Sequence, residues 1–180
     1  MMPPMNQEEI TEAAYGQRFA IQRSIRYHGH RIAFWEFLAF ITKLLEFIPT
    51  STAFIFIFSG NGGQHALQWV LLAAAIFSFL AIILEAHRRI KHQSRQRARM
   101  CELDLRLPLN LETVTEGLLE DIYASRRRIE LDDGVLLPCL NVICHNEQLT
   151  ADGHPENPAK LNFVERNIGR YLPIPYSSKP

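Results

Sequence analysis

The 180-residue sequence is poor in cysteine and has no net charge. Its 3 cysteines are too few for a small secreted scaffold held together by disulfides. Its 19 basic and 19 acidic side chains cancel to a formal net charge of zero, which removes the simplest argument for nucleic-acid binding. Because 47% of the residues are hydrophobic and 21% are charged, the composition also excludes a disordered or collagen-like chain.

Motifs of known enzyme classes are also missing. The sequence has no nucleophile elbow, no glycine loop that would cradle a phosphate and no His-Glu-x-x-His. Gly60 to Gly63 is typical of a turn and does not match a nucleotide-binding loop. We therefore expect no catalytic residue and no cofactor, and interpret the protein as not an enzyme.

Two long apolar stretches are what the sequence does contain. The first ends in Ala-Phe-Ile-Phe-Ile-Phe at 53–58, and the second runs from Leu67 to Leu84 without a charge. The second is long enough to cross a bilayer as a helix, and a short uncharged turn at 60–65 joins the two. A soluble helical hairpin is the alternative, but the chain has little other apolar material to cover it. The pattern predicts a transmembrane hairpin with spans at about 37–59 and 67–86.

Basic residues flank the apolar stretches and indicate their orientation. The segment 87–100 carries six basic side chains and no acid, four arginines precede the first span, and the turn carries none. The positive-inside rule then puts both termini in the cytoplasm of a multi-pass inner-membrane protein, with all the cysteines on the reducing side. We interpret the cluster as a topology and anionic-lipid signal and not as a nucleic-acid site: Arg88, Arg89, Lys91, Arg95, Arg97 and Arg99.

The pattern predicts an all-α chain of four segments. These are an N-terminal cytoplasmic helix at 1–32, the hairpin at 33–86, a basic helix extension at 87–106 and a cytoplasmic helical region at 107–180. No apolar leader precedes the first helix, so we expect no cleavable signal peptide. Within the last segment we expect helices from about Leu111 to Leu131, from Pro138 to Ala151 and from Leu161 to Tyr171, with Asn110 and Pro138 starting the first two.

The first span carries four polar residues on one helical face: Glu36, Lys43, Glu46 and Thr50. Charges at membrane depth usually face a bundle interior, a cavity or a partner. One interpretation is a polar stripe that lines a pore or an oligomer seam. The favoured one is ion pairing across the hairpin, which would set Glu36 level with Arg88 or Arg89 and Lys43 near Glu85.

Two groups of possible metal ligands are weak. Cys139, Cys144 and His145, with His154 further on, lack the short cysteine spacing that zinc favours, so we interpret the cysteines as small buried side chains. His28-Gly29-His30 is weaker still as a ligand pair. With Tyr27 and Trp35, we expect it at the headgroup boundary. The sequence predicts no metal site.

The layout from about residue 18 to 171 resembles a known kind of protein. The segment Arg23-Ser24-Ile25-Arg26-Tyr27-His28 enters the two-span hairpin, and Leu136-Leu137-Pro138 and Cys144-His145-Asn146-Glu147 lie in the tail. This resembles uncharacterised two-span inner-membrane proteins of phages and prophages. More distantly it is similar to the SLATT-type two-transmembrane effector domains of bacterial defence islands. The resemblance implies a membrane protein that forms pores or perturbs membranes.

Two functions remain as expectations. The first is a non-enzymatic, homo-oligomeric inner-membrane protein that permeabilises or perturbs the membrane in a phage or defence context. The second is a membrane-tethered interaction module whose cytoplasmic helices bind a protein partner. The zero net charge of the chain hides segments of opposite charge. Residues 87–106 have seven basic and two acidic side chains, while residues 107–180 have seven basic and eleven acidic ones.

Overall fold

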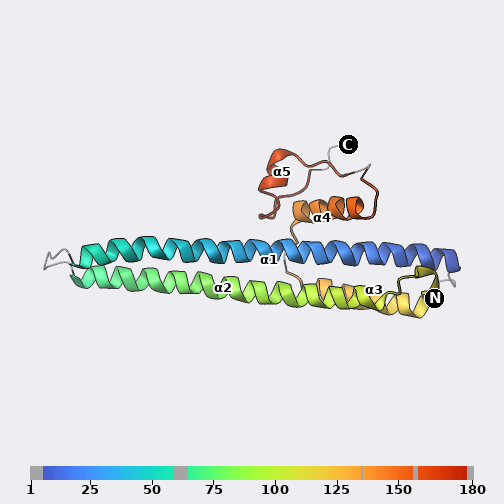
Figure 1. Cartoon of the computed structure of the whole chain (residues 1–180), viewed down its shortest axis with the longest axis horizontal. Coiled ribbons are helices and arrows are strands. Elements are labelled where there is room, and N and C mark those ends of the chain that lie inside the picture. Colours follow the sequence, from blue (N-terminus) through green and yellow to red (C-terminus); the bar gives the residue numbers. More distant parts are fainter. Residues whose placement is uncertain (1–5, 59–64, 135, 156–157, 178–180) are drawn as a thin grey trace. The chain divides into compact units, whose positions relative to one another are not determined.

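The protein is all-helical, as predicted, in the residues described by the computed structural model. These are 6–58, 65–134, 136–155 and 158–177, with side chains described except at 44–58, 65–75, 77–79 and 81. Within them no helix is both long enough and apolar enough to cross a membrane, and much of the predicted spans lies outside the described side chains. The helices are α1 (Gln7–Phe58), α2 (His65–Arg106), the short 3-10 helix η1 (Leu111–Thr113), α3 (Glu116–Asp132), α4 (Pro138–Ala151) and α5 (Phe163–Asn167) (Figure 1).

The chain divides into two compact units. The larger unit consists of residues 1–30 and 94–180, and the two-helix unit consists of residues 31–93. Helices α1 and α2 contribute to both units, since each runs through one of the boundaries. The predicted division into four segments is not tested by this result and stays a prediction.

The core of the larger unit joins three helices. Ile10, Ala14 and Ile21 of α1 pack with a cluster from α2 and α3, and their spacing of four and seven residues puts them on one helical face. Their buried partners come from α2, from the segment between α2 and α3, and from α3. They are Met100, Leu103, Leu107, Val114, Leu119, Ile122 and Ile129. Burying this apolar face is what holds the N-terminal part of α1 against the end of α2.

Polar interactions hold the start of α1 and the chain just after α2. The Asn6 side chain accepts from the backbone N–H of Glu9 at 2.8 Å, while the Glu9 carboxylate accepts from the Asn6 N–H at 2.8 Å. This reciprocal pair is a capping box, which satisfies N–H groups at the start of α1. After α2, the Arg18 guanidinium donates to the carbonyls of Leu107 at 3.2 Å and Pro108 at 2.6 Å.

The helix predicted from Leu111 to Leu131 is broken in two. Asn110 caps as expected, but it starts only the 3-10 turn η1. Thr115 then adopts an extended conformation and caps α3 by accepting from Leu118 N–H. The apolar residues that recur at helical spacing in this segment still point to the core, because Val114, Ile122 and Ile129 are buried. The apolar periodicity was therefore informative about burial and not about helix continuity.

The last two helices follow the predictions to different extents. Helix α4 spans Pro138–Ala151 as predicted, with proline in its first turn, and Gly153 takes a left-handed φ of 82° just beyond it. Helix α5 is much shorter than the predicted 161–171 segment and covers Phe163–Asn167. A capping box between Asn162 and Glu165 starts it, and turns replace helix from 168 onwards.

In the two-helix unit, small side chains are buried and large apolar ones are exposed. Ala39 is 7% exposed, Thr42 5% and Ala86 1%, which marks the faces that α1 and α2 turn towards the interior of this unit. The large apolar side chains that remain exposed by 46–61% are Phe37, Phe40, Ile76, Leu80, Ile82 and Leu84.

Candidate functional site

The predicted polar face of the first span is only partly within the described residues. Glu36 and Lys43 are exposed, and with Phe40 they share a face of α1 that is distinct from the buried face carrying Ala39 and Thr42. The side chains of Glu46 and Thr50 lie outside the described residues. The described half of this face therefore points away from the interior of the two-helix unit.

Glu85 and Arg89, for which the sequence predicted ion pairs across the hairpin, are paired with each other. The Glu85 carboxylate accepts from Arg89 Nε at 2.6 Å, an i,i+4 pair within α2. The Arg89 guanidinium also lies 5.9 Å from the centre of the Trp35 ring, a cation–π contact. Among the described side chains, Glu36 forms no ion pair with Arg88 or Arg89.

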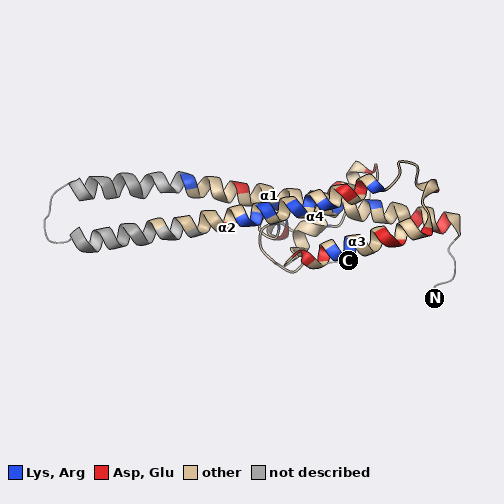
Figure 2. Cartoon of the chain, turned by 90° about the horizontal axis from the view of Figure 1, so that it is seen from below, with Lys and Arg blue, Asp and Glu red and all other residues tan. Residues whose placement is uncertain are grey.

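All six members of the basic cluster are exposed, and Lys and Arg mark this stretch of α2 in blue in Figure 2. Gln93 and Gln96 of the same helix are 1% and 2% exposed. Arg99 is committed to an ion pair with Asp132 of α3 at 3.0 Å, at a surface where such pairs contribute little to stability. Arg89 is paired with Glu85, and the other four members are exposed at the surface, as a lipid-binding role requires.

Helix α4 binds to α1 through a polar network. Gln148 is 1% exposed; its Oε1 accepts from Arg26 Nε at 2.9 Å, and its Nε2 donates to Gln22 Oε1 at 2.7 Å. Tyr27, which packs on Leu140 and Cys144, accepts at its hydroxyl from Leu137 N–H at 3.0 Å. Tyr27 is thus buried in the larger unit, whereas the sequence analysis predicted that it would lie at the membrane boundary.

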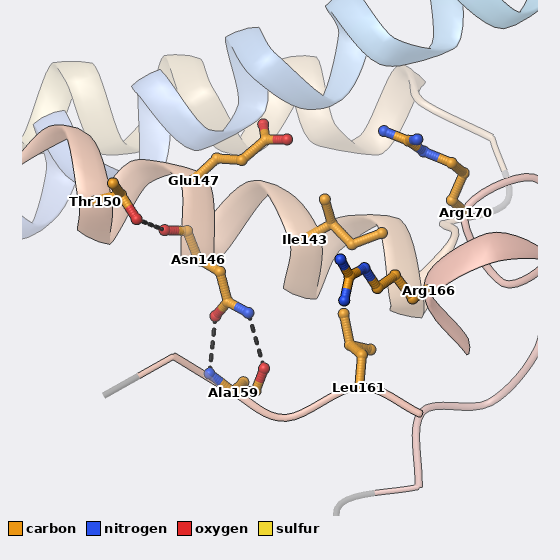
Figure 3. A pocket seen from close by; sticks show the side chains of 8 residues that line it. All are labelled: Ile143, Asn146, Glu147, Thr150, Ala159, Leu161, Arg166 and Arg170. Atoms are coloured by element: carbon orange, nitrogen blue, oxygen red, sulfur yellow. Dashed lines mark hydrogen bonds between the residues drawn. The ribbon is translucent and has the colours of Figure 1, made fainter. Parts of the chain in front are cut away.

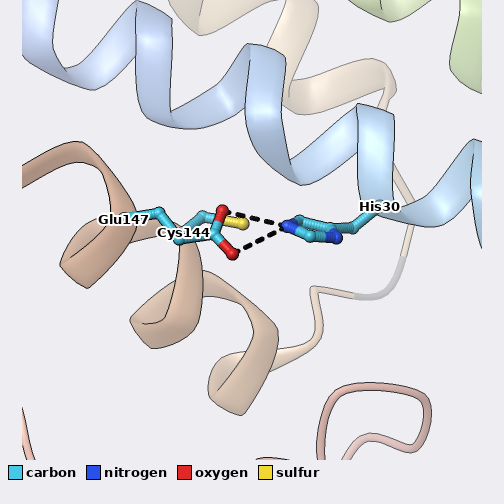
Figure 4. Close-up of side chains that lie close together, drawn as sticks. All are labelled: His30, Cys144 and Glu147. Atoms are coloured by element: carbon cyan, nitrogen blue, oxygen red, sulfur yellow. Dashed lines mark hydrogen bonds and ion pairs between the residues drawn. The ribbon is translucent and has the colours of Figure 1, made fainter. Parts of the chain in front are cut away.

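Three potential metal ligands meet at this same α1–α4 contact. His30 of α1 faces Cys144 and Glu147 of α4, and one ligand atom from each lies within 4.8 Å of the other two (Figure 4). His30 Nε2 is 2.9 Å from one Glu147 carboxylate oxygen and 3.1 Å from the other. Cys144 is fully buried, and burial, with the nearby Glu147 carboxylate, raises the pKa of its thiol to about 12.

Of the possible ligands considered in the sequence, Cys144 and His30 gather, together with Glu147, whereas Cys139 and His145 do not belong to the cluster. The Cys139 thiol donates to the carbonyl of Ile174 at 3.4 Å, and the His145 ring packs edge-on against Phe19, 5.2 Å between centres. Burial and the Arg23 charge lower the pKa of His145. The spacing of Cys144 and Glu147 on one helical face was readable from the sequence, but His30 lies too far along the chain to be connected with them.

A polar pocket of about 440 Å³ opens beside this cluster. Asn146 closes part of its wall, because its side chain donates to the Ala159 carbonyl and accepts from the Ala159 N–H, both at 2.8 Å. The sticks of Figure 3 show the lining side chains on α4, on the segment before α5 and from α5 onwards. They are Ile143, Asn146, Glu147, Thr150, Ala159, Leu161, Arg166 and Arg170.

A second pocket of about 330 Å³ lies between α1, α2 and the segment around α3 and α4. Arg23 lines it, and its buried Nε has no hydrogen-bond partner, while the buried Nε of Arg126 lies 3.4 Å from a Glu130 carboxylate oxygen in an ion pair. Burial, together with the Arg126 charge, lowers the pKa of Arg23. Glu130 and Asp133 also line this pocket, so its charges are mixed.

Comparison with known proteins does not identify the chain. No protein family, no curated protein and no solved structure matches it significantly. Any functional conclusion therefore depends on the residues and geometry described above.

Proposed function

We propose that this protein is a non-enzymatic, homo-oligomeric inner-membrane protein that forms pores or perturbs the membrane in a phage or defence context. In this proposal the two-helix unit belongs to a two-span transmembrane hairpin, and the larger unit is its cytoplasmic helical part, with both termini inside. Membrane lipids and further copies of the chain are its partners.

One observation carries the proposal. The two-helix unit exposes Leu84 and Phe37 by 61% each, Phe40 by 57% and Ile76 by 54%. Exposed apolar side chains gathered on one small unit are typical of a surface that contacts lipid or protein. They lie within the two predicted spans, and the exposed basic cluster of α2 follows directly along the chain. Lipid contact explains both features together.

The charged face of α1 supports self-association. Glu36 and Lys43 do not point to the interior of the two-helix unit, and Glu85 is already paired with Arg89. Charges in a membrane are costly unless they find a partner or water. A seam between copies, in which Glu36 of one chain meets Lys43 of another, supplies such a partner.

Ion flux from vesicles tests this proposal. Full-length protein is reconstituted into liposomes, and flux is compared for the wild type, Lys43→Leu and a control, Lys160→Leu, whose residue is exposed in the larger unit. We expect flux in the wild type and the control, and a clear loss or changed ion selectivity in Lys43→Leu. Reconstituted protein that passes no ions contradicts the pore, and protein that stays soluble without detergent contradicts the membrane assignment.

The larger unit favours the second candidate, a membrane-tethered module that binds a cytoplasmic protein. This unit has its own apolar core and a pocket of about 440 Å³, more structure than an anchor or a pore lining needs. Replacing residues 31–93 by an unrelated two-span hairpin separates the candidates. Retained activity in cells supports the tether, and lost activity supports the pore.

A further inference from the structure

We propose that His30, Cys144 and Glu147 bind a divalent transition-metal ion, Zn²⁺ foremost, which fastens α4 to α1. This inference goes beyond the proposed membrane function and does not depend on it. It concerns residues that the larger unit alone provides.

The ligand set has the chemistry that zinc selects. Zinc binds thiolate sulfur, imidazole nitrogen and carboxylate oxygen at about 2.0–2.3 Å in tetrahedral sites. Ligand atoms around such an ion are then separated by roughly 3.3–3.8 Å, as follows from those bond lengths. The three ligand atoms here already lie within 4.8 Å of one another, and His30 Nε2 is 2.9 Å from a Glu147 oxygen. Small side-chain movements suffice to bring them to bonding distance.

The backbone holds the ligands in place before any ion binds. Cys144 and Glu147 are three residues apart on α4, so they project from one helical face. The Gln148 network with Arg26 and Gln22 fixes the facing part of α1, one turn before His30. A site whose ligands sit on rigid helices loses little conformational entropy when an ion binds.

One side of the site is open to solvent. Cys144 is fully buried, whereas the side chains of His30 and Glu147 are 31% and 37% exposed. Glu147 also lines the 440 Å³ pocket, which has room for water. Three protein ligands plus one open position is the arrangement of zinc sites that accept water or a small ligand.

The charge of a divalent ion is balanced in this site once the Cys144 thiol is ionised. Binding displaces the Cys144 proton to water and replaces the His30–Glu147 contact with two metal bonds. The thiolate and the carboxylate then neutralise the two positive charges of the ion. Burial and the Glu147 carboxylate raise the pKa of the Cys144 thiol, so the ion has to displace its proton, while the charges of Arg170, Arg23 and Arg26 act in the opposite direction and favour the thiolate. Because the ligand set includes a thiolate and an imidazole, we expect selectivity for ions that bind thiolate strongly over Mg²⁺ or Ca²⁺, which prefer oxygen ligands.

Cobalt spectroscopy on the full-length protein in detergent tests the site. Co²⁺ substitutes for zinc and gives a sulfur-to-metal charge-transfer band only when a thiolate is bound. We expect one Co²⁺ per chain with that band, displaced by Zn²⁺ and absent in Cys144→Ser. His30→Ala and Glu147→Gln should each weaken Zn²⁺ affinity at least tenfold. The matched controls are Cys139→Ser and His145→Ala, which alter a second buried thiol and a neighbouring imidazole and should keep wild-type affinity.

Thermal unfolding supplies a second measurement. An ion that binds only the folded protein raises the unfolding temperature by mass action. Zn²⁺ should therefore raise that temperature in the wild type and in Cys139→Ser but not in Glu147→Gln, whose side chain keeps its size. A wild type without the cobalt band, or a band that persists in Cys144→Ser, overturns the proposal. A Zn²⁺ affinity that His145→Ala lowers as much as His30→Ala does also overturns it.

Discussion

Arg26 Nε donates to Gln148 Oε1 at 2.9 Å across the contact between α1 and α4, and the glutamine is only 1% exposed. The same glutamine donates to Gln22 at 2.7 Å and to Asp152 at 3.0 Å. One buried amide thus hydrogen-bonds two residues of α1 and Asp152 at the end of α4. Removing it would break these three hydrogen bonds at the contact between the two helices.

Gln148→Leu should therefore destabilise the larger unit. The loss of a buried, hydrogen-bonded group that includes a charged partner costs about 1–3 kcal/mol. Urea unfolding followed by circular dichroism measures this change in the free energy of unfolding. Gln96→Leu is the matched control, because Gln96 is 2% exposed but its Oε1 has no hydrogen-bond partner. Its replacement should be neutral or stabilising, and equal costs for the two variants would contradict this assignment.

Gly169→Ala should be destabilising for a steric reason. A Cβ at this position would lie 2.7 Å from Cys139 Sγ and 2.7 Å from the Glu165 carbonyl oxygen, and the carbonyl belongs to the backbone. Overpacking of this kind costs about 1–3 kcal/mol. Gly16→Ala serves as the comparison, since Gly16 lies inside α1 with nothing within 4 Å of the added atom. There the substitution should stabilise the protein by about 0.5–1 kcal/mol through helix propensity.

The three cysteines should differ sharply in reactivity. Cys101 is half-buried, whereas Cys139 and Cys144 are buried, and burial raises the pKa of both of these thiols. At pH 8 in the presence of EDTA, a thiol reagent should modify Cys101 first and reach the other two only in denaturant. A Cys101→Ser variant identifies the fast site. Rapid modification of the native Cys101→Ser variant would contradict this prediction.

The raised pKa of Cys144 also has a consequence for alkaline stability. In the unfolded chain this thiol ionises near pH 9, whereas in the fold its pKa is about 12. The folded state therefore binds more protons between these values, so stability is present below pH 9 and falls as pH rises towards 12. With EDTA present, Cys144→Ala should lose less stability than the wild type between pH 9 and 11, as unfolding at each pH would measure. An equal decline in the stability of both proteins would contradict this role of Cys144.

Glu165 should hold the segment that follows α5. Its carboxylate is 3% exposed and accepts from Ser177 N–H at 3.0 Å, from Ser177 Oγ at 2.7 Å and from Asn162 N–H at 2.8 Å. Glu165→Ala removes the capping box and these bonds, so limited proteolysis should cleave near residues 168–177 much faster. Ser177→Ala keeps the capping box and should give an intermediate rate. Unchanged cleavage in Glu165→Ala would show that packing alone holds the segment.

The sequence predicted those helix boundaries that depend on local chemistry. Pro138 and Asp152-Gly153 bracket α4 because proline suits the first turn and glycine takes the left-handed φ of 82°. The break before α3 was missed because apolar periodicity continues through Val114, although Thr115 followed by Glu116 is a readable cap signal. Likewise, Asn162 with Glu165 three residues later marks the start of α5.

Contacts between distant parts of the chain could not be predicted in this way. Helical spacing put Cys144 and Glu147 on one face, but nothing in a single sequence connects them with His30. The expected pairing of Lys43 with Glu85 did not take into account that Arg89, one turn along the same helix, can pair with Glu85, as it does in the structure. Tyr27 was expected at a membrane boundary because aromatic residues favour it, yet a hydrogen bond to Leu137 and contacts with α4 bury it.

The division of the larger unit between residues 1–30 and 94–180 determines when during synthesis it can fold. Gln22 meets Asp104 across 82 residues of sequence, and Arg18 reaches Leu107 across 89. A ribosome makes the apolar face of Ile10, Ala14 and Ile21 first, and must then complete the whole two-helix unit before that face finds its partners. Until Ile129 has emerged, the first segment of the nascent chain exposes this face to chaperones and to aggregation.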